Sequence, residues 1–129
     1  MKPILISIAV CFLMLSGCSN EMKEKTASND TQSAVKKYKG QIVDNICATG
    51  YKGKMGELVT IYSKEKARSY YCKAGGYSLY TDGTLIPFDK SSGEIVDKYL
   101  SQPSGTLNVM VTAENVNDEL HLISISNTK

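Results

Sequence analysis

Hydrophobic and polar residues alternate along much of the chain after residue 37, and this pattern predicts a domain built mainly of strands. In residues 107–114, apolar side chains at every second position alternate with mostly polar ones, which is typical of a half-buried strand. Further strands are expected at residues 38–47, 77–81, 84–88 and 119–126. The Asp82-Gly83 pair lies between two of them and predicts a tight hairpin.

Two positions in these strands depart from a simple pattern. Gly40 is expected to mark a bulge or a close approach of two backbones. In the last strand, leucines at 120 and 122 point one way while isoleucines at 123 and 125 point the other, which predicts a bulge or burial on both faces. His121 lies opposite the two leucines, so we expect it to be exposed and without a structural role.

A spacing of three to four residues predicts two short helices. Ser63 is expected to cap the first, and Gly75-Gly76 to end it. Its apolar face is interpreted as core packing and consists of Ala67, Tyr70, Tyr71 and Ala74. The second helix is expected over residues 91–102, with Ser91 and Glu94 at capping-box spacing. Residues 48–56 are predicted to be a loop, and 57–62 fit either a helix or a strand.

This order of elements predicts the fold class. Five strands with two interposed helices and no long parallel unit indicate a small, mainly β, α+β domain. Its simplest form is a curled five-stranded sheet or a partly open barrel.

The first 36 residues have a different character. A basic residue, Lys2, precedes an apolar run of 12 residues from Ile4 to Leu15, which is shorter than the about 20 residues of a membrane-spanning helix. The run ends in Leu15-Ser16-Gly17-Cys18, and the whole segment is typical of a secretory signal.

These four residues resemble the lipobox of bacterial lipoproteins, in which the cysteine thiol is acylated with chains such as palmitate and the preceding peptide is removed. The resemblance implies a signal peptide over 1–17 and a lipidated Cys18 in the cell envelope. Because Ser19 follows, it also implies the periplasmic face of the outer membrane in a Gram-negative bacterium. Residues 18–36 are then the lipidated cysteine with a flexible polar tether, and 37–129 a single domain. An ordinary signal peptide with an incidental cysteine is the alternative.

The sequence has four cysteines. If Cys11 is removed with the signal and Cys18 is acylated, Cys47 and Cys72 remain, and in an exported protein they are expected to form one disulfide. A redox-active pair is the alternative, although there is no Cys-x-x-Cys spacing. With His121 as the single histidine, the set is too small for a closed zinc site, so no metal and no cofactor are expected.

Charge is unevenly distributed. Residues 36–73 hold nine basic and three acidic residues, a balance of +6, whereas residues 74–129 have a balance of −4. The basic half is either a solvated surface or a binding surface for an anionic partner. The candidate binding residues are Lys52, Lys54, Lys64, Lys66 and Arg68. Because these residues lack the aromatic alternation of single-strand binders, no nucleic-acid partner is expected.

Three short motifs resemble a group of small exported bacterial domains, many of which look like OB-type β-barrels. They are Gly40-x-Ile42-x-Asp44-x-x-Cys47, then Cys72-Lys73-Ala74-Gly75-Gly76-Tyr77, and the Asp82-Gly83 pair. The resemblance implies an OB-like fold. Members often have a histidine and a further cysteine between the two shared cysteines. This chain has neither, so no metal or haem role is carried over.

Together these features predict a non-catalytic binding or structural module, tethered to the membrane by its lipid. The expected partners are an envelope protein, a glycan or a small anionic ligand, bound by the loops of the basic, tyrosine-rich half. An enzyme needs a matched nucleophile and base or a metal, and the sequence offers no recognisable set. The alternative is a redox or enzymatic protein that uses Cys47 and Cys72.

Overall fold

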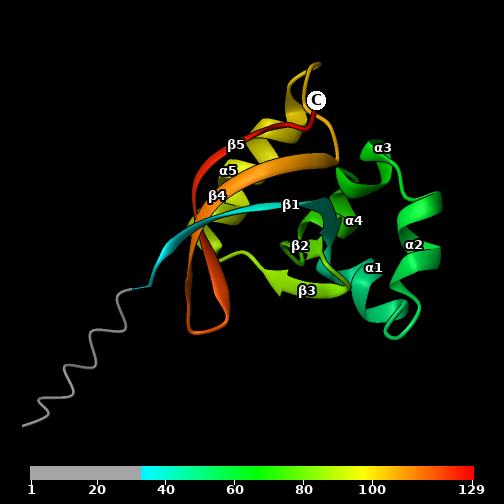
Figure 1. Ribbon diagram of the computed structural model, residues 1–129. Helices are drawn as coiled ribbons and strands as arrows, with labels where there is room; N and C mark the ends of the chain where they lie inside the picture. The colour runs from blue at the N-terminus through cyan, green and yellow to red at the C-terminus, as the bar shows by residue number, and fades with distance from the viewer. Residues whose placement is uncertain (1–32) are drawn as a thin grey trace, which may run out of the picture. The chain divides into compact units, whose positions relative to one another are not determined.

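The computed structural model describes residues 33–129, which form a five-stranded antiparallel sheet with short helices (Figure 1). The predicted signal peptide, Cys18 and most of the predicted tether lie outside the described residues. Within residues 33–129, no helix is long and apolar enough to cross a membrane.

The strands pair in the order β3-β2-β1-β4-β5, all antiparallel. They are β1 (Val35–Asp44), β2 (Tyr77–Thr81), β3 (Thr84–Pro87), β4 (Asn108–Val116) and β5 (Glu119–Asn127). The predicted α+β class with five strands is confirmed. The strand ladders leave the sheet open between β3 and β5, where a single parallel bridge joins Phe88 to Leu120.

Strand β1 is the centre of the sheet, and its limits differ from the predicted strand. It begins at Val35, which pairs with Glu114, so strand structure starts before the predicted domain boundary at residue 37. It ends at Asp44 rather than at residue 47, because Asp44 caps a helix. Gly40 marks a close approach, as predicted: a Cβ atom there would lie 2.4 Å from the backbone oxygen of Tyr80.

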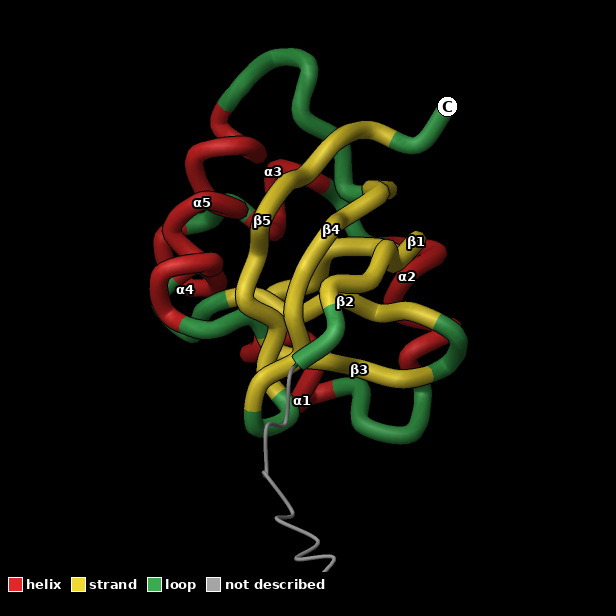
Figure 2. The backbone as a smooth tube through the Cα atoms, turned by 60° about the vertical axis from the view of Figure 1, so that its left-hand side comes forward, coloured by secondary structure: helices red, strands yellow, loops and turns green. Residues whose placement is uncertain are grey.

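The core forms where alternating apolar side chains of the sheet meet the helices. The predicted alternation in β4 is confirmed, since Val109, Val111 and Ala113 are fully buried. Helix α5 (Lys90–Ser101) lies beside β5, as Figure 2 shows, and buries Val96 and Leu100. Burial of apolar area stabilises the fold by about 25 cal/mol per Å².

Both hairpin turns follow from their sequences. Asp82 and Gly83 have φ values of 47° and 74°, which is the left-handed backbone that a two-residue hairpin needs and that Asp-Gly favours. Asn117 and Asp118 have φ values of 53° and 63° in the turn between β4 and β5. The predicted bulge in β5 is also confirmed, because the register jumps from Thr112–Ser124 to Ala113–Leu122.

Four helices connect β1 to β2, where the sequence predicted one helix after a loop over 48–56 and left 57–62 as helix or strand. The loop prediction is wrong in part, because α1 and α2 include both of its ends. They are α1 (Asn45–Gly50), α2 (Met55–Ile61), α3 (Lys64–Ala67) and α4 (Tyr70–Lys73). Ser63 caps α3 as predicted, but Ser69 caps a new helix and breaks the predicted one in two. The break separates Ala67, which is buried, from Tyr70 and Tyr71, which are 88% and 73% exposed. The prediction that these tyrosines pack in the core is therefore wrong.

The cap of α5 also differs from the prediction. Asp89, not Ser91, accepts a hydrogen bond from the backbone N–H of Ser92 at 2.8 Å. His121 is exposed as predicted, but it has a partner, since its Nδ1 lies 2.7 Å from Oδ2 of Asp89. The bulge and the hairpin place β5 beside the start of α5, a contact that strand alternation cannot predict.

Candidate functional site

Asp44 fixes the position of Cys47. As the residue that caps α1, Asp44 accepts a hydrogen bond at its Oδ1 from the backbone N–H of Cys47, at 2.8 Å. Asp, Asn, Ser and Thr are favoured at this place because their side chains satisfy a free N–H of the first turn. The motif Asp44-x-x-Cys47 is therefore a helix cap with a cysteine in the first turn of the helix.

The same arrangement recurs in α4. Ser69 accepts a hydrogen bond from the backbone N–H of Cys72, again three residues later, at 3.4 Å. The two capped turns bring the Sγ atoms of Cys47 and Cys72 to 3.9 Å. A disulfide bond is about 2.05 Å long, so both side chains are thiols here. The two cysteines are brought together as expected, and the disulfide itself stays a prediction.

Asn45 holds the two helices against each other. Its backbone N–H donates to the oxygen of Gly76 at 3.0 Å, and its side-chain Nδ2 donates to the oxygen of Gly75 at 2.9 Å. A Cβ atom at Gly75 would lie 2.7 Å from the side chain of Ile46, so a larger residue at this contact would displace that side chain. The Gly-Gly segment thus serves to dock α4 on α1.

Tyr62 contacts Asp44, the residue that caps α1, in two places. Its hydroxyl accepts from the backbone N–H of Asp44 at 2.8 Å and donates to Oδ2 of the same residue. Asp44 is 0% exposed, and among residues 33–129 no basic side chain forms an ion pair with it. Burial, followed by the hydrogen bond to Asp44, raises the pKa of Tyr62 well above its usual range.

Burial and Asp44 also change the pKa of Cys47. Burial, followed by the hydrogen bond and the negative charge of Asp44, raises the pKa of the Cys47 thiol to about 12. Nucleophilic and redox-active cysteines have lowered pKa values, because the thiolate is the reactive form. At neutral pH the Cys47 thiol is protonated and is a poor nucleophile.

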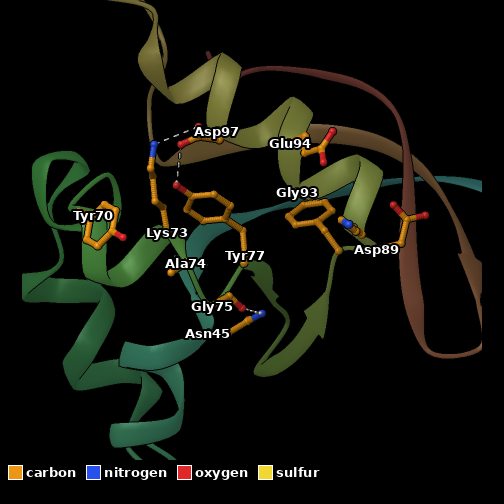
Figure 3. Close-up of a pocket in the computed structure, with 13 residues that line it drawn as sticks. Asn45, Tyr70, Lys73, Ala74, Gly75, Tyr77, Asp89, Gly93, Glu94 and Asp97 are labelled. Carbon is orange, nitrogen blue, oxygen red and sulfur yellow. Dashed lines mark hydrogen bonds and ion pairs between the residues drawn. The ribbon is translucent and has the colours of Figure 1, made fainter.

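A cleft of about 640 Å³ lies between α4 and α5 (Figure 3). At its centre the Tyr77 hydroxyl donates to Oδ1 of Asp97 at 3.1 Å, and Nζ of Lys73 lies 3.8 Å from Oδ2 of Asp97. Burial, followed by the charge of Asp97, raises the pKa of Tyr77 above its usual range. These contacts join α4, β2 and α5 across the floor of the cleft.

The rim of the cleft combines an aromatic ring with charged groups of both signs. Figure 3 shows Tyr70 on α4 at one end and Glu94 and Asp89 at the α5 end. Tyr71 is also exposed but does not line the cleft. The lining includes two lysines, Lys73 and Lys90, and three carboxylates, so it has little net charge.

The predicted basic residues have different local environments. Lys64 donates two hydrogen bonds of 2.6 Å, to the backbone oxygens of Gln102 and Gly105, and so holds the loop that follows α5. Lys52 lines a second cleft of about 530 Å³, next to α1 and β3. Lys54, Lys66 and Arg68 are exposed, and none of these three lines either cleft.

Sequence reasoning missed three residues of these sites. Tyr62 lies 18 residues from Asp44, and no local pattern links them. The sequence pattern predicts only a capping-box spacing for Glu94 and Ser91, whereas the docking of α5 on β2 makes Glu94 and Asp97 line the cleft. Tyr70 and Tyr71 were predicted to pack in the core, and their exposure depends on the break at Ser69.

Comparisons with family models, curated proteins and solved structures give no match for this chain. The candidate sites therefore rest on the geometry of this chain's own residues.

Proposed function

We propose that this chain is a non-catalytic binding module of the bacterial envelope that holds a glycan in the cleft between α4 and α5. The observation that carries this proposal is the Tyr70 side chain, which is 88% exposed at the rim of a cleft of about 640 Å³. Ligand sites commonly have volumes of about 300–1,000 Å³ and combine an apolar surface with a few polar groups.

The chemistry of the lining fits a sugar. An exposed tyrosine ring offers a flat face on which the C–H groups of a sugar can pack. Glu94, Asp97 and Asn45 offer acceptors and donors for hydroxyl groups. Because the charges of the lining nearly cancel, a neutral polar ligand fits it better than a polyanion.

We also propose an OB-type fold for this domain. An OB-type arrangement, a partly open five-stranded barrel, is supported by the strand order and by the parallel bridge between Phe88 and Leu120 at the two sheet edges. OB folds bind ligands, including oligosaccharides, on one sheet face and adjacent loops. An experimental structure with β3 and β5 separated along their whole length would exclude this arrangement.

The proposed location at the membrane is tested through the lipid anchor on Cys18. A diacylated chain should remain with membranes through salt washing, because two acyl chains anchor stably where one binds only marginally. Cys18→Ser should release the protein or leave it uncleaved. Wild-type protein in the soluble fraction with an unmodified Cys18 would contradict the anchor.

Glycan binding is tested with soluble muropeptides and N-acetylglucosamine oligomers, titrated against the protein and followed by calorimetry. Tyr70→Ala should weaken binding by about tenfold, as expected for the loss of roughly 1–1.5 kcal/mol from an aromatic contact. Tyr71→Ala is the matched control, because this neighbouring tyrosine is exposed outside the cleft. Equal effects of the two variants, or no binding of any of these sugars, would exclude the proposal.

If the partner is anionic rather than a neutral glycan, the binding experiments should give a different result. Binding that falls steeply with salt, and that is lost on Lys66→Glu with Arg68→Glu, would assign the function to the basic residues instead. Tyr70→Ala would then have little effect.

A redox role is the second candidate, and the 3.9 Å separation of the two sulfur atoms favours it. The raised pKa of Cys47 opposes it. Rapid exchange of the reduced protein with a model disulfide near neutral pH would support the redox role, and slow exchange would exclude it.

A further inference from the structure

Asp44, Cys47 and Cys72 form a cluster of potential metal ligands, and none of the three lines the proposed glycan cleft. One ligand atom from each residue lies within 4.8 Å of the others, and the two Sγ atoms are 3.9 Å apart. In a tetrahedral zinc site with Zn–S distances of about 2.3 Å, two sulfur ligands lie about 3.8 Å apart. The two sulfur atoms thus already have the separation that such a site requires.

The second observation is the burial of the Asp44 carboxylate. It is fully buried, and no basic side chain among residues 33–129 pairs with it. Buried charges in proteins are paired or coordinate metals, because removing a charge from water is costly. Its oxygens accept hydrogen bonds from the Cys47 N–H and the Tyr62 hydroxyl, and each oxygen keeps a lone pair for a cation.

We propose that these three residues, with both cysteines reduced, bind one thiophilic divalent cation of the Zn²⁺ type. Thiolate ligands select such ions over Mg²⁺ or Ca²⁺. Cys72 is buried whereas Cys47 is only partly buried, so the cluster is accessible to solvent at Cys47. Three protein ligands with one open position make an exchangeable site rather than a closed structural one.

Surrounding residues orient the ligands. Tyr62 holds the Asp44 carboxylate, and the caps by Asp44 and Ser69 fix the two cysteines. Loss of such an outer partner typically weakens metal binding by about 10–100-fold. A disulfide would remove both sulfur ligands, so the oxidised protein does not bind the ion.

The test titrates Co²⁺ into the full chain after reduction, without oxygen, and follows the thiolate-to-cobalt charge-transfer absorption, with Zn²⁺ added in competition. The wild type should bind one Co²⁺ per chain, and Zn²⁺ should displace it. The double variant with Cys47→Ser and Cys72→Ser should lose at least about 100-fold in affinity. Cys11 and Cys18 are unchanged in this variant, so they contribute equally to both titrations.

Two further variants test an outer partner of the cluster and a carboxylate outside it. Tyr62→Phe should weaken binding by about tenfold or more while circular dichroism shows a folded domain. Asp118→Asn is the control, because this carboxylate lies in the β4–β5 turn, and it should bind as the wild type does. The proposal is overturned if the reduced wild type binds no more tightly than the double variant, or if the ion joins two chains in a 2:1 complex.

Discussion

The Tyr62 hydroxyl contacts Asp44 from two sides: it accepts the backbone N–H at 2.8 Å and donates to the carboxylate. This pair joins the end of β1 to the segment between α2 and α3. It also supports the residue that caps α1 and positions Cys47. A single hydroxyl group therefore links the central strand of the sheet to the cysteine cluster.

Tyr62→Phe should be strongly destabilising. The change leaves a buried N–H and a buried carboxylate oxygen without their partner, and each such group costs about 1–3 kcal/mol. We expect the free energy of unfolding in urea to fall by about 2–4 kcal/mol. Tyr71→Phe, on an exposed tyrosine of α4, should change it by less than about 0.5 kcal/mol. Similar values for the two variants would contradict the role of the Tyr62 hydroxyl.

Gly40→Ala should weaken the pairing of β1 with β2. The added Cβ would lie 2.4 Å from the backbone oxygen of Tyr80, so the strands would have to separate. Overpacking of this kind typically costs about 1–3 kcal/mol. Gly56→Ala, in α2 with open space around it, should instead stabilise the protein by about 0.5–1 kcal/mol. Thermal unfolding of both variants measures the two opposite effects.

The cysteine pair should be oxidised in protein isolated from its expected envelope location. Cys47 and Cys72 enclose 24 residues, so the cross-link should stabilise the fold by about 3 kcal/mol. Cys47→Ser should lower the melting temperature of the oxidised protein and have a smaller effect under reducing conditions. Alkylation of both thiols in denaturant, without added reductant, would show that the native protein has no disulfide.

Asp89 should make stability depend on pH in the acid range. Burial tends to raise its pKa, but hydrogen bonds from Ser92, His121 and Ser91 outweigh this and hold the pKa well below its ordinary value. The ionised form therefore stabilises the fold above about pH 4. This contribution is lost as the pH falls below that value toward the lowered pKa.

The measurement is the unfolding free energy of Asp89→Asn and wild type at pH 7 and at pH 2. The variant keeps a side chain that can cap α5 but loses the charge that accepts the hydrogen bonds of Ser92, Ser91 and His121, which should cost about 1 kcal/mol at pH 7. The difference should shrink at pH 2. Asp82→Asn, in a turn that asparagine also favours, is the control. A difference that is constant with pH would contradict the role of the Asp89 charge.

The sequence by itself determined the local features of this domain. Alternation places the strands, and Asp82-Gly83 and Asn117-Asp118 supply the left-handed turns. The mismatch between leucines and isoleucines in β5 predicts its bulge. These features depend on neighbouring residues, whose backbone preferences act over a few positions.

The tertiary structure alone decided which distant groups meet. The spacing of Ala67, Tyr70 and Tyr71 predicts one buried helix face, yet a competing cap at Ser69 breaks the helix and exposes both tyrosines. The Tyr62–Asp44 and His121–Asp89 contacts, and the close sulfur atoms of Cys47 and Cys72, depend on the packing of separate elements. Such contacts depend on how the whole core packs, and a local sequence pattern does not contain this information.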